Sequence, residues 1–214
     1  DSLNNVYKIK ISNDEYFLIE NRSNWVLDNI DIDSLRRKNK IDENIMGHWF
    51  DVVIDEFLPR GKLELDPETQ VITKFDHYDY GLPGSGILIW HVKEPDPSIY
   101  STGVNSILNY RHIQLEEADG AQDIGKEVFF PTWLFDPSIG TPFDFWYLGN
   151  KEYLRMNPFN KDIIFNNESN PSTLTIDGSE SFLSIKVLSE ISENMEVQIL
   201  FNKNINIINL YNEP

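Results

Sequence analysis

The sequence predicts a mainly β fold, an antiparallel β-sandwich-like domain with long irregular loops and at most a few short helices. No segment of about 12 or more residues shows the 3.6-residue periodicity of an amphipathic helix. Short alternating or wholly apolar runs recur instead, separated by turn residues. Hydrophobic residues make up 40% of the 214 residues and aromatic residues 13%, which is enough to bury a core.

The first elements expected are two hairpins. In residues 7–11 apolar and lysine residues alternate, a Ser-Asn-Asp turn follows, and residues 16–19 form a second apolar run. Residues 23–50 show no clear period and predict an irregular segment or one short helix within a loop. A strand at residues 52–57 is expected next. The second hairpin joins residues 61–65 to 71–75 through the turn Asp66-Pro67-Glu68-Thr69.

The strongest strand signal is Gly86 to Val92, which is apolar on both sides of the pleat and therefore predicts a central strand covered on both faces. Further strands are expected at 111–116, 181–188 and 195–201. Residues 117–170 are turn-rich and too long for a plain connection, so they are functional or partly helical. We expect residues 1–201 to be one β-rich domain and 202–214 to be an edge strand that runs into a linker tail.

Charge and composition exclude several classes of protein. The formal charge of -17 argues against a nucleic-acid or anionic-membrane partner, because both need a basic surface. No apolar run reaches the length of about 18 residues needed for a membrane span. The absence of cysteine excludes disulfides, Cys-ligated zinc and thiol nucleophiles. The chain begins Asp1-Ser2-Leu3 without a targeting signal, so we expect a piece of a longer protein.

Motifs for an independent active site are missing from the sequence. The histidines are not spaced as an HExxH zinc helix requires, no G-x-S-x-G elbow occurs, and Gly84-Ser85-Gly86 precedes a strand rather than a helix. We therefore expect no catalytic residues on this chain.

The acidic residues predict a calcium site. Glu117, Asp119 and Asp123 lie in one loop that turns at Gly120, and Asp144 is a distant candidate ligand. Several oxygens that converge on a turn are what a hard cation requires, although the spacing is not that of an EF-hand. The alternatives are a solvated acidic turn or an ion pair between Glu117 and Arg111.

Five further residues are candidates for binding or for an interface, and each also has an ordinary structural interpretation. His91 is a ligand or a hydrogen-bonded core residue. Glu20 and Arg22 reach into the cleft of a neighbouring domain or form a structural ion pair. Trp133 and Trp146, with Phe143, Phe145 and Tyr147, form a stacking platform for glycan or peptide or belong to the core.

Three ordered motifs resemble one protein family. They are Asp14-Glu15-Tyr16-Phe17-Leu18-Ile19-Glu20-Asn21-Arg22, the run Tyr80-Gly81-Leu82-Pro83-Gly84-Ser85-Gly86-Ile87-Leu88-Ile89-Trp90-His91-Val92, and Glu116-Glu117-Ala118-Asp119-Gly120. They are similar to the region downstream of the zinc site in secreted M6-family metallopeptidases, the immune inhibitor A group. The resemblance spans roughly residues 6 to 201. This chain departs from it in the long insertion at 23–75 and at Lys93, where the family has an acidic residue, although Glu94 keeps the second acid.

The resemblance implies a non-catalytic, β-rich portion of a secreted bacterial zinc peptidase that completes the fold and the substrate cleft. The zinc ion and peptide hydrolysis would belong to an upstream HExxH segment. The partner of this β-rich portion would be that upstream segment or another protein chain. Two alternatives remain open. One is an extracellular β-sandwich that binds glycan or protein through residues 132–147, and the other is a structural subunit descended from an inactive peptidase.

Overall fold

The computed structural model describes residues 6–23, 63–69, 72–75, 79, 82–94, 104–105, 111–126, 138, 140–201 and 204–211. Within these residues the fold is mainly β, as predicted, with two four-stranded antiparallel sheets and one separate hairpin. Most of the predicted insertion (24–62), with the strand expected at 52–57, lies outside the described residues.

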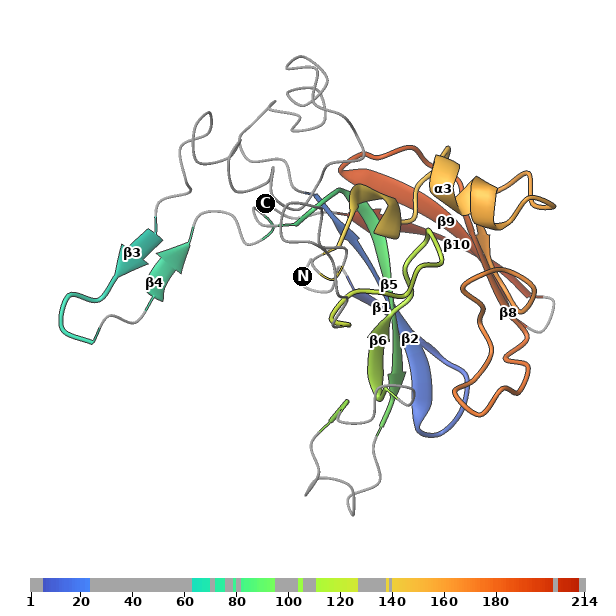
Figure 1. The fold of residues 1–214 in the computed structure, drawn as a ribbon, viewed down its shortest axis with the longest axis horizontal. Coiled ribbons are helices and arrows are strands. Elements are labelled where there is room, and N and C mark those ends of the chain that lie inside the picture. The colour runs from blue at the N-terminus through green and yellow to red at the C-terminus, as the bar shows by residue number, and fades with distance from the viewer. Residues whose placement is uncertain are drawn as a thin grey trace.

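The first sheet has the strand order β1-β2-β5-β6 (Figure 1). It comprises β1 (Val6–Lys10), β2 (Glu15–Arg22), β5 (Gly86–Lys93) and β6 (Ile113–Leu115). The predicted first hairpin is confirmed. The central strand is confirmed too, because β5 lies between β2 and β6 and buries Ile87 and Ile89 on one face and Leu88 and Val92 on the other.

Strand β6 is shorter than expected. The backbone N–H groups of His112 and Ile113 both donate to Oδ1 of Asn105, at 2.7 and 2.9 Å. The side chain of Asn105 thus binds backbone donors at the start of this short strand, and Arg111 and His112 lie before it.

The second sheet has the order β10-β9-β8-β7. It comprises β7 (Ile164–Phe165), β8 (Leu183–Val187), β9 (Asn194–Phe201) and β10 (Asn204–Tyr211). Its edge strand β10 pairs with β9 along its whole length, so the edge strand expected in the tail is present. The hairpin of β3 (Leu63–Leu65) and β4 (Ile72–Phe75) is also confirmed and lies apart from both sheets in Figure 1.

The core lies between the two sheets. Alternate residues of β2 and β5 face alternate residues of β8 and β9, and the ring of Phe17 meets that of Phe165 edge-on at 5.2 Å. Short helical turns close one end of this core: the 3₁₀ turn η4 (Pro142–Asp144) and helix α3 (Lys151–Met156), whose Tyr153 ring lies 5.4 Å from that of Trp146. The main core side chains are Phe17, Ile19, Ile87, Ile89, Trp146, Tyr153, Phe165, Leu183, Ile185, Met195, Val197 and Ile199.

Candidate functional site

Three of the four carboxylates expected to bind calcium lie together. Glu117, Asp119 and Asp144 each contribute an oxygen, and these oxygens all lie within 4.8 Å of one another. Glu117 is 2% exposed and Asp144 1% exposed, while Asp119 is half-buried. The alternative of a solvated acidic turn is therefore wrong, because the chain removes most of this cluster from water.

Backbone N–H groups of the same loop orient two of these carboxylates. Glu117 accepts from Asp123 N at 2.7 Å and from Ile124 N at 2.9 Å, and Asp119 accepts from Ala121 N at 3.0 Å. Asp123, the fourth predicted ligand, thus contributes its backbone N–H to Glu117. The expected alternative pair between Glu117 and Arg111 is wrong, because the Arg111 guanidinium donates to the backbone oxygen of Ile124 at 3.0 Å.

The third carboxylate is brought in by the loop before α3. Thr141 caps the 3₁₀ turn: its hydroxyl donates to Oδ1 of Asp144 at 3.0 Å, and its backbone N–H donates to Oδ2. The backbone oxygen of Asp144 accepts from Ala118 N at 2.9 Å. This bond ties the two acidic segments to each other directly.

Two buried side chains hold that loop in place. Trp146 forms a β-bridge with Ile87, and its indole N–H donates to the backbone oxygen of Glu116 at 2.7 Å. The side-chain amide of Asn150 donates to the backbone oxygens of Phe143 and Phe145, both at 2.8 Å. The contacts of Trp146 and Asn150 with the core and with backbone groups therefore bring Asp144 close to Glu117.

Crowding and burial raise the pKa of all three carboxyl groups. Removal from water raises the pKa of Glu117 to about 7, and the negative charges of Asp123 and Asp119 add to the effect. Burial, followed by the charge of Asp119, raises the pKa of Asp144 to about 8. The pKa of Asp119 is raised as well, mainly by burial. Among the described residues none of the three carboxylates forms an ion pair with a lysine or arginine. A bound cation would therefore offset the repulsion among these buried carboxylates.

His91 lies between two glutamates in the first sheet. It is 6% exposed, its Nδ1 lies 3.1 Å from Glu116 Oε1, and its Nε2 lies 2.7 Å from Glu15 Oε1. Its ring also stacks against Phe17 at 4.4 Å. His91 is thus hydrogen-bonded on both sides, and it does not join the three-carboxylate cluster.

Glu20 and Arg22 form an ion pair with each other. Arg22 Nη2 lies 2.8 Å from Glu20 Oε2, Arg22 Nη1 lies 3.3 Å from Asp79, and Trp90 Nε1 donates to Glu20 Oε1 at 2.8 Å. The interpretation of Glu20 and Arg22 as an ion pair therefore accounts for the position of both side chains.

The aromatic platform is corrected by the structure. Trp146 is 0% exposed and belongs to the core, so its ring cannot stack on a ligand at the surface. It is buried because the bridge to Ile87 draws it between the sheets. Trp133, the second tryptophan of the expected platform, lies outside the described residues.

Sequence reasoning missed three residues that organise these sites: Thr141, Asn150 and Glu15. A threonine three residues before an acid, with proline between them, is a capping signal that identifies Thr141. Glu15 precedes Phe17 and Ile19 on the same face of β2, so strand alternation places it inward beside His91. The bonds from the Asn150 side chain to the backbone oxygens of Phe143 and Phe145 follow no recognised sequence pattern.

Comparisons with known protein families, with curated proteins and with solved structures found no match to this chain. Within the described part of the chain, no helix has the length and apolar character needed to cross a bilayer.

Proposed function

We propose that this chain is a non-catalytic β-sandwich module whose loops are held together by calcium, and that it is the downstream portion of a secreted M6-like zinc metallopeptidase. The observation that carries the calcium part is the convergence of Glu117, Asp119 and Asp144 within 4.8 Å. The peptidase part is supported by the three ordered motifs described above.

The separation of the oxygens supports calcium. Calcium binds oxygens at about 2.3–2.6 Å, so two ligands on opposite sides of the ion lie about 5 Å apart. Three carboxylate oxygens within 4.8 Å of one another fit around such an ion. A carboxylate oxygen that accepts one backbone N–H keeps a second lone pair for a metal.

Binding here would connect two segments of the fold. Glu117 and Asp119 follow β6 of the first sheet, whereas Asp144 lies in the turn before α3. A cation shared by both would strengthen the connection already made by Ala118 N and the Asp144 backbone oxygen. In a peptidase this would set the shape of the face that the β-rich portion presents to the catalytic segment.

Calcium binding is tested by thermal unfolding of the chain with calcium, with magnesium and with chelator. A ligand that binds only the folded state stabilises it by about 2.7 kcal/mol at roughly a hundredfold excess over Kd. For 214 residues this corresponds to roughly 5–10 °C in Tm. No rise at about 10 mM calcium, well above the Kd of weak extracellular sites, would overturn the proposal.

A matched pair of variants locates the site. Glu117→Gln removes one charged ligand, whereas Glu190→Gln makes the same change at an exposed position in the loop between β8 and β9. We expect the calcium-induced rise in Tm to be lost in Glu117→Gln and kept in Glu190→Gln. Equal rises in both variants would place the ion elsewhere.

The peptidase relationship is tested separately. The gene sequence upstream of Asp1 should encode an HExxH helix, and joining that segment to this chain should yield zinc-dependent peptide hydrolysis that neither piece has alone. An upstream sequence without HExxH would favour the structural subunit instead.

A further inference from the structure

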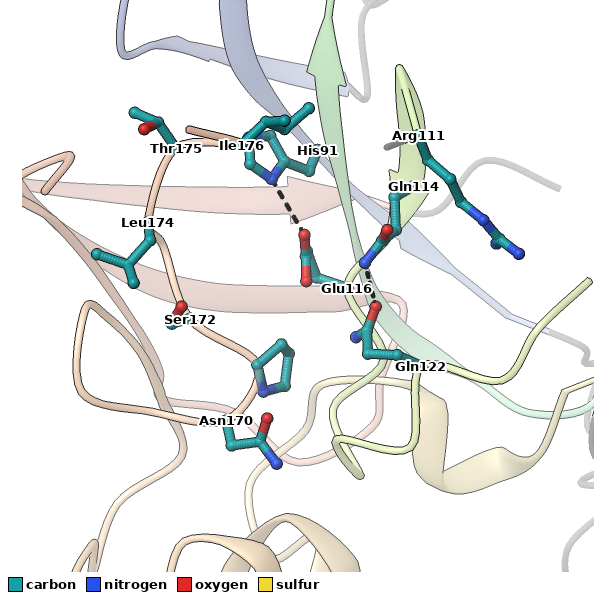
Figure 2. A pocket seen from close by; sticks show the side chains of 11 residues that line it. His91, Arg111, Gln114, Glu116, Gln122, Asn170, Ser172, Leu174, Thr175 and Ile176 are labelled. Carbon is teal, nitrogen blue, oxygen red and sulfur yellow. Dashed lines mark hydrogen bonds and ion pairs between the residues drawn. The ribbon is translucent and has the colours of Figure 1, made fainter. Parts of the chain in front are cut away.

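A pocket of about 320 Å³ opens beside His91 and Glu116 (Figure 2). One wall comes from the first sheet and the loop after it, with Gln114, Glu116 and Gln122. The opposite wall is the segment from Asn170 to Ile176, which leads towards the second sheet. The pocket does not include the carboxylates of Glu117, Asp119 or Asp144.

The carboxylate of Glu116 is the buried charge of this pocket. Glu116 is 5% exposed, and its Oε1 faces His91 at 3.1 Å. Within the described part of the chain, its second oxygen receives no hydrogen bond from a protein donor. Figure 2 shows this carboxylate between the two walls. A buried carboxylate needs donors, so a ligand that supplies several N–H groups fits this position.

Glu116 is held firmly in this orientation. His91 bonds it on one side and contacts Glu15 at 2.7 Å on the other, while Glu15 also accepts from Ile176 N at 2.6 Å and lies 3.4 Å from Lys93 Nζ. Lys93 lies beside Glu15, so Glu116 is the acid at the pocket end of this series of contacts. The site is therefore preorganised rather than formed by a mobile side chain.

The two walls differ in chemistry. Leu174, Ile176 and Pro171 provide apolar surface on the loop side, whereas Gln114 and Gln122 hydrogen-bond each other through their amides on the sheet side. Arg111 also borders the pocket, but its guanidinium is turned away from Glu116 in Figure 2 and donates to the backbone oxygens of Ile124 and Gly125 at 3.0 and 3.5 Å. It therefore does not neutralise Glu116.

We propose that this pocket binds the side chain of an arginine residue in a peptide segment, with its guanidinium on Glu116 and its methylene groups against Leu174 and Ile176. A guanidinium has five N–H donors in a plane and pairs with a carboxylate through two of them, while its stem packs on apolar surface. The formal charge of -17 attracts such a basic segment. A sugar is disfavoured, because the described residues that line the pocket include no Trp, Tyr or Phe ring.

The probe is N-acetyl-arginine amide, and its matched control is N-acetyl-citrulline amide, which has nearly the same shape but no charge. Each is titrated into the chain at constant calcium and followed by the shifts of backbone amide NMR signals. We expect saturable binding of the arginine probe, at least tenfold tighter than that of citrulline. The shifts should be largest at residues 114–116 and 174–176. Equal binding of both probes, or shifts spread over other surfaces, would overturn the proposal.

Variants test the role of the carboxylate. Glu116→Gln keeps the shape and removes the charge, so we expect at least a tenfold loss of affinity for the arginine probe. Glu190→Gln should bind as the parent chain does. An unchanged affinity in Glu116→Gln would overturn the proposal. If Glu116→Gln does not fold, the comparison of arginine with citrulline on the parent chain still decides. Repeating the titration in chelator separates this result from the calcium site, because arginine should bind in either condition.

Discussion

At the scale of single residues, the space around Asp144 depends on a glycine. Gly140 has a φ of +90°, a conformation that side-chain-bearing residues adopt only at a cost. A Cβ at this position would lie 3.0 Å from Asp144 Oδ2 and 3.1 Å from Pro83 Cγ. Gly149 has the same φ of +90°, but a Cβ there would meet nothing within 4 Å.

This pair of glycines predicts separable effects on stability and on calcium binding. Gly140→Ala and Gly149→Ala should each cost about 1–2 kcal/mol of unfolding free energy, from the left-handed backbone conformation. Only Gly140→Ala should also displace Asp144 and weaken calcium binding by about tenfold or more. Denaturant unfolding measures the first effect and calorimetric titration the second. Equal calcium affinities in the two variants would show that Asp144 does not bind the ion.

At the scale of elements, helix α3 is short and is held by one buried side chain. Asn150 is 0% exposed, its Oδ1 accepts from Glu152 N and Tyr153 N, and its Nδ2 donates to the backbone oxygens of Phe143 and Phe145. It therefore caps the helix and fixes the preceding loop at once. A helix of one and a half turns has little stability of its own, so these bonds to the loop matter.

Replacing Asn150 by alanine should lower the unfolding free energy by about 3 kcal/mol, from the lost cap and the buried carbonyl groups left without a donor. The ion pair between half-buried Glu152 and exposed Arg155 on the same helix provides the control. Glu152→Gln should change stability by less than about 0.5 kcal/mol. Urea unfolding followed by circular dichroism compares the two. A loss for Asn150→Ala as small as that of Glu152→Gln would contradict the role given to Asn150.

At the scale of the whole molecule, the buried carboxyl groups of Glu117 and Asp144 make the stability of the fold depend on pH. Folding raises the pKa of Glu117 to about 7 and that of Asp144 to about 8. Their protonated forms are therefore favoured in the folded state over the unfolded one. This contribution is fully present below the ordinary carboxyl pKa near 4 and is lost as the pH rises through 7 and 8.

The calcium-free chain should therefore lose stability as the pH rises from about 5 to about 8, with Tm falling by several degrees. Calcium competes with these protons, so its stabilising effect should be larger at about pH 8 than at about pH 5.5. Differential scanning calorimetry with chelator and with calcium, at both pH values, measures this. A calcium effect that is the same at both values would show that these carboxyl groups are not its ligands.

Much of the fold was predictable because its signals are local. Alternation predicted the first strand of the first hairpin and an apolar run predicted the second. The residues Asp66 to Thr69 predicted the turn of the second hairpin, and the run that is apolar on both faces predicted that β5 is central. The edges of these elements were less predictable. Strand β6 begins later than expected, at Ile113, and the side chain of Asn105 binds the backbone N–H groups of His112 and Ile113 there.

The sequence by itself determined the β class, the central strand, and the acidic loop in which Glu117 and Asp119 lie. Only the tertiary structure decided that Asp144 joins them, that Asp123 contributes its backbone instead, that Trp146 is buried, and that Glu15 meets His91. The physical reason is the distance along the sequence over which each effect acts. Alternation and turn preferences act between neighbouring residues, whereas these contacts depend on strand order and on packing between segments distant in sequence.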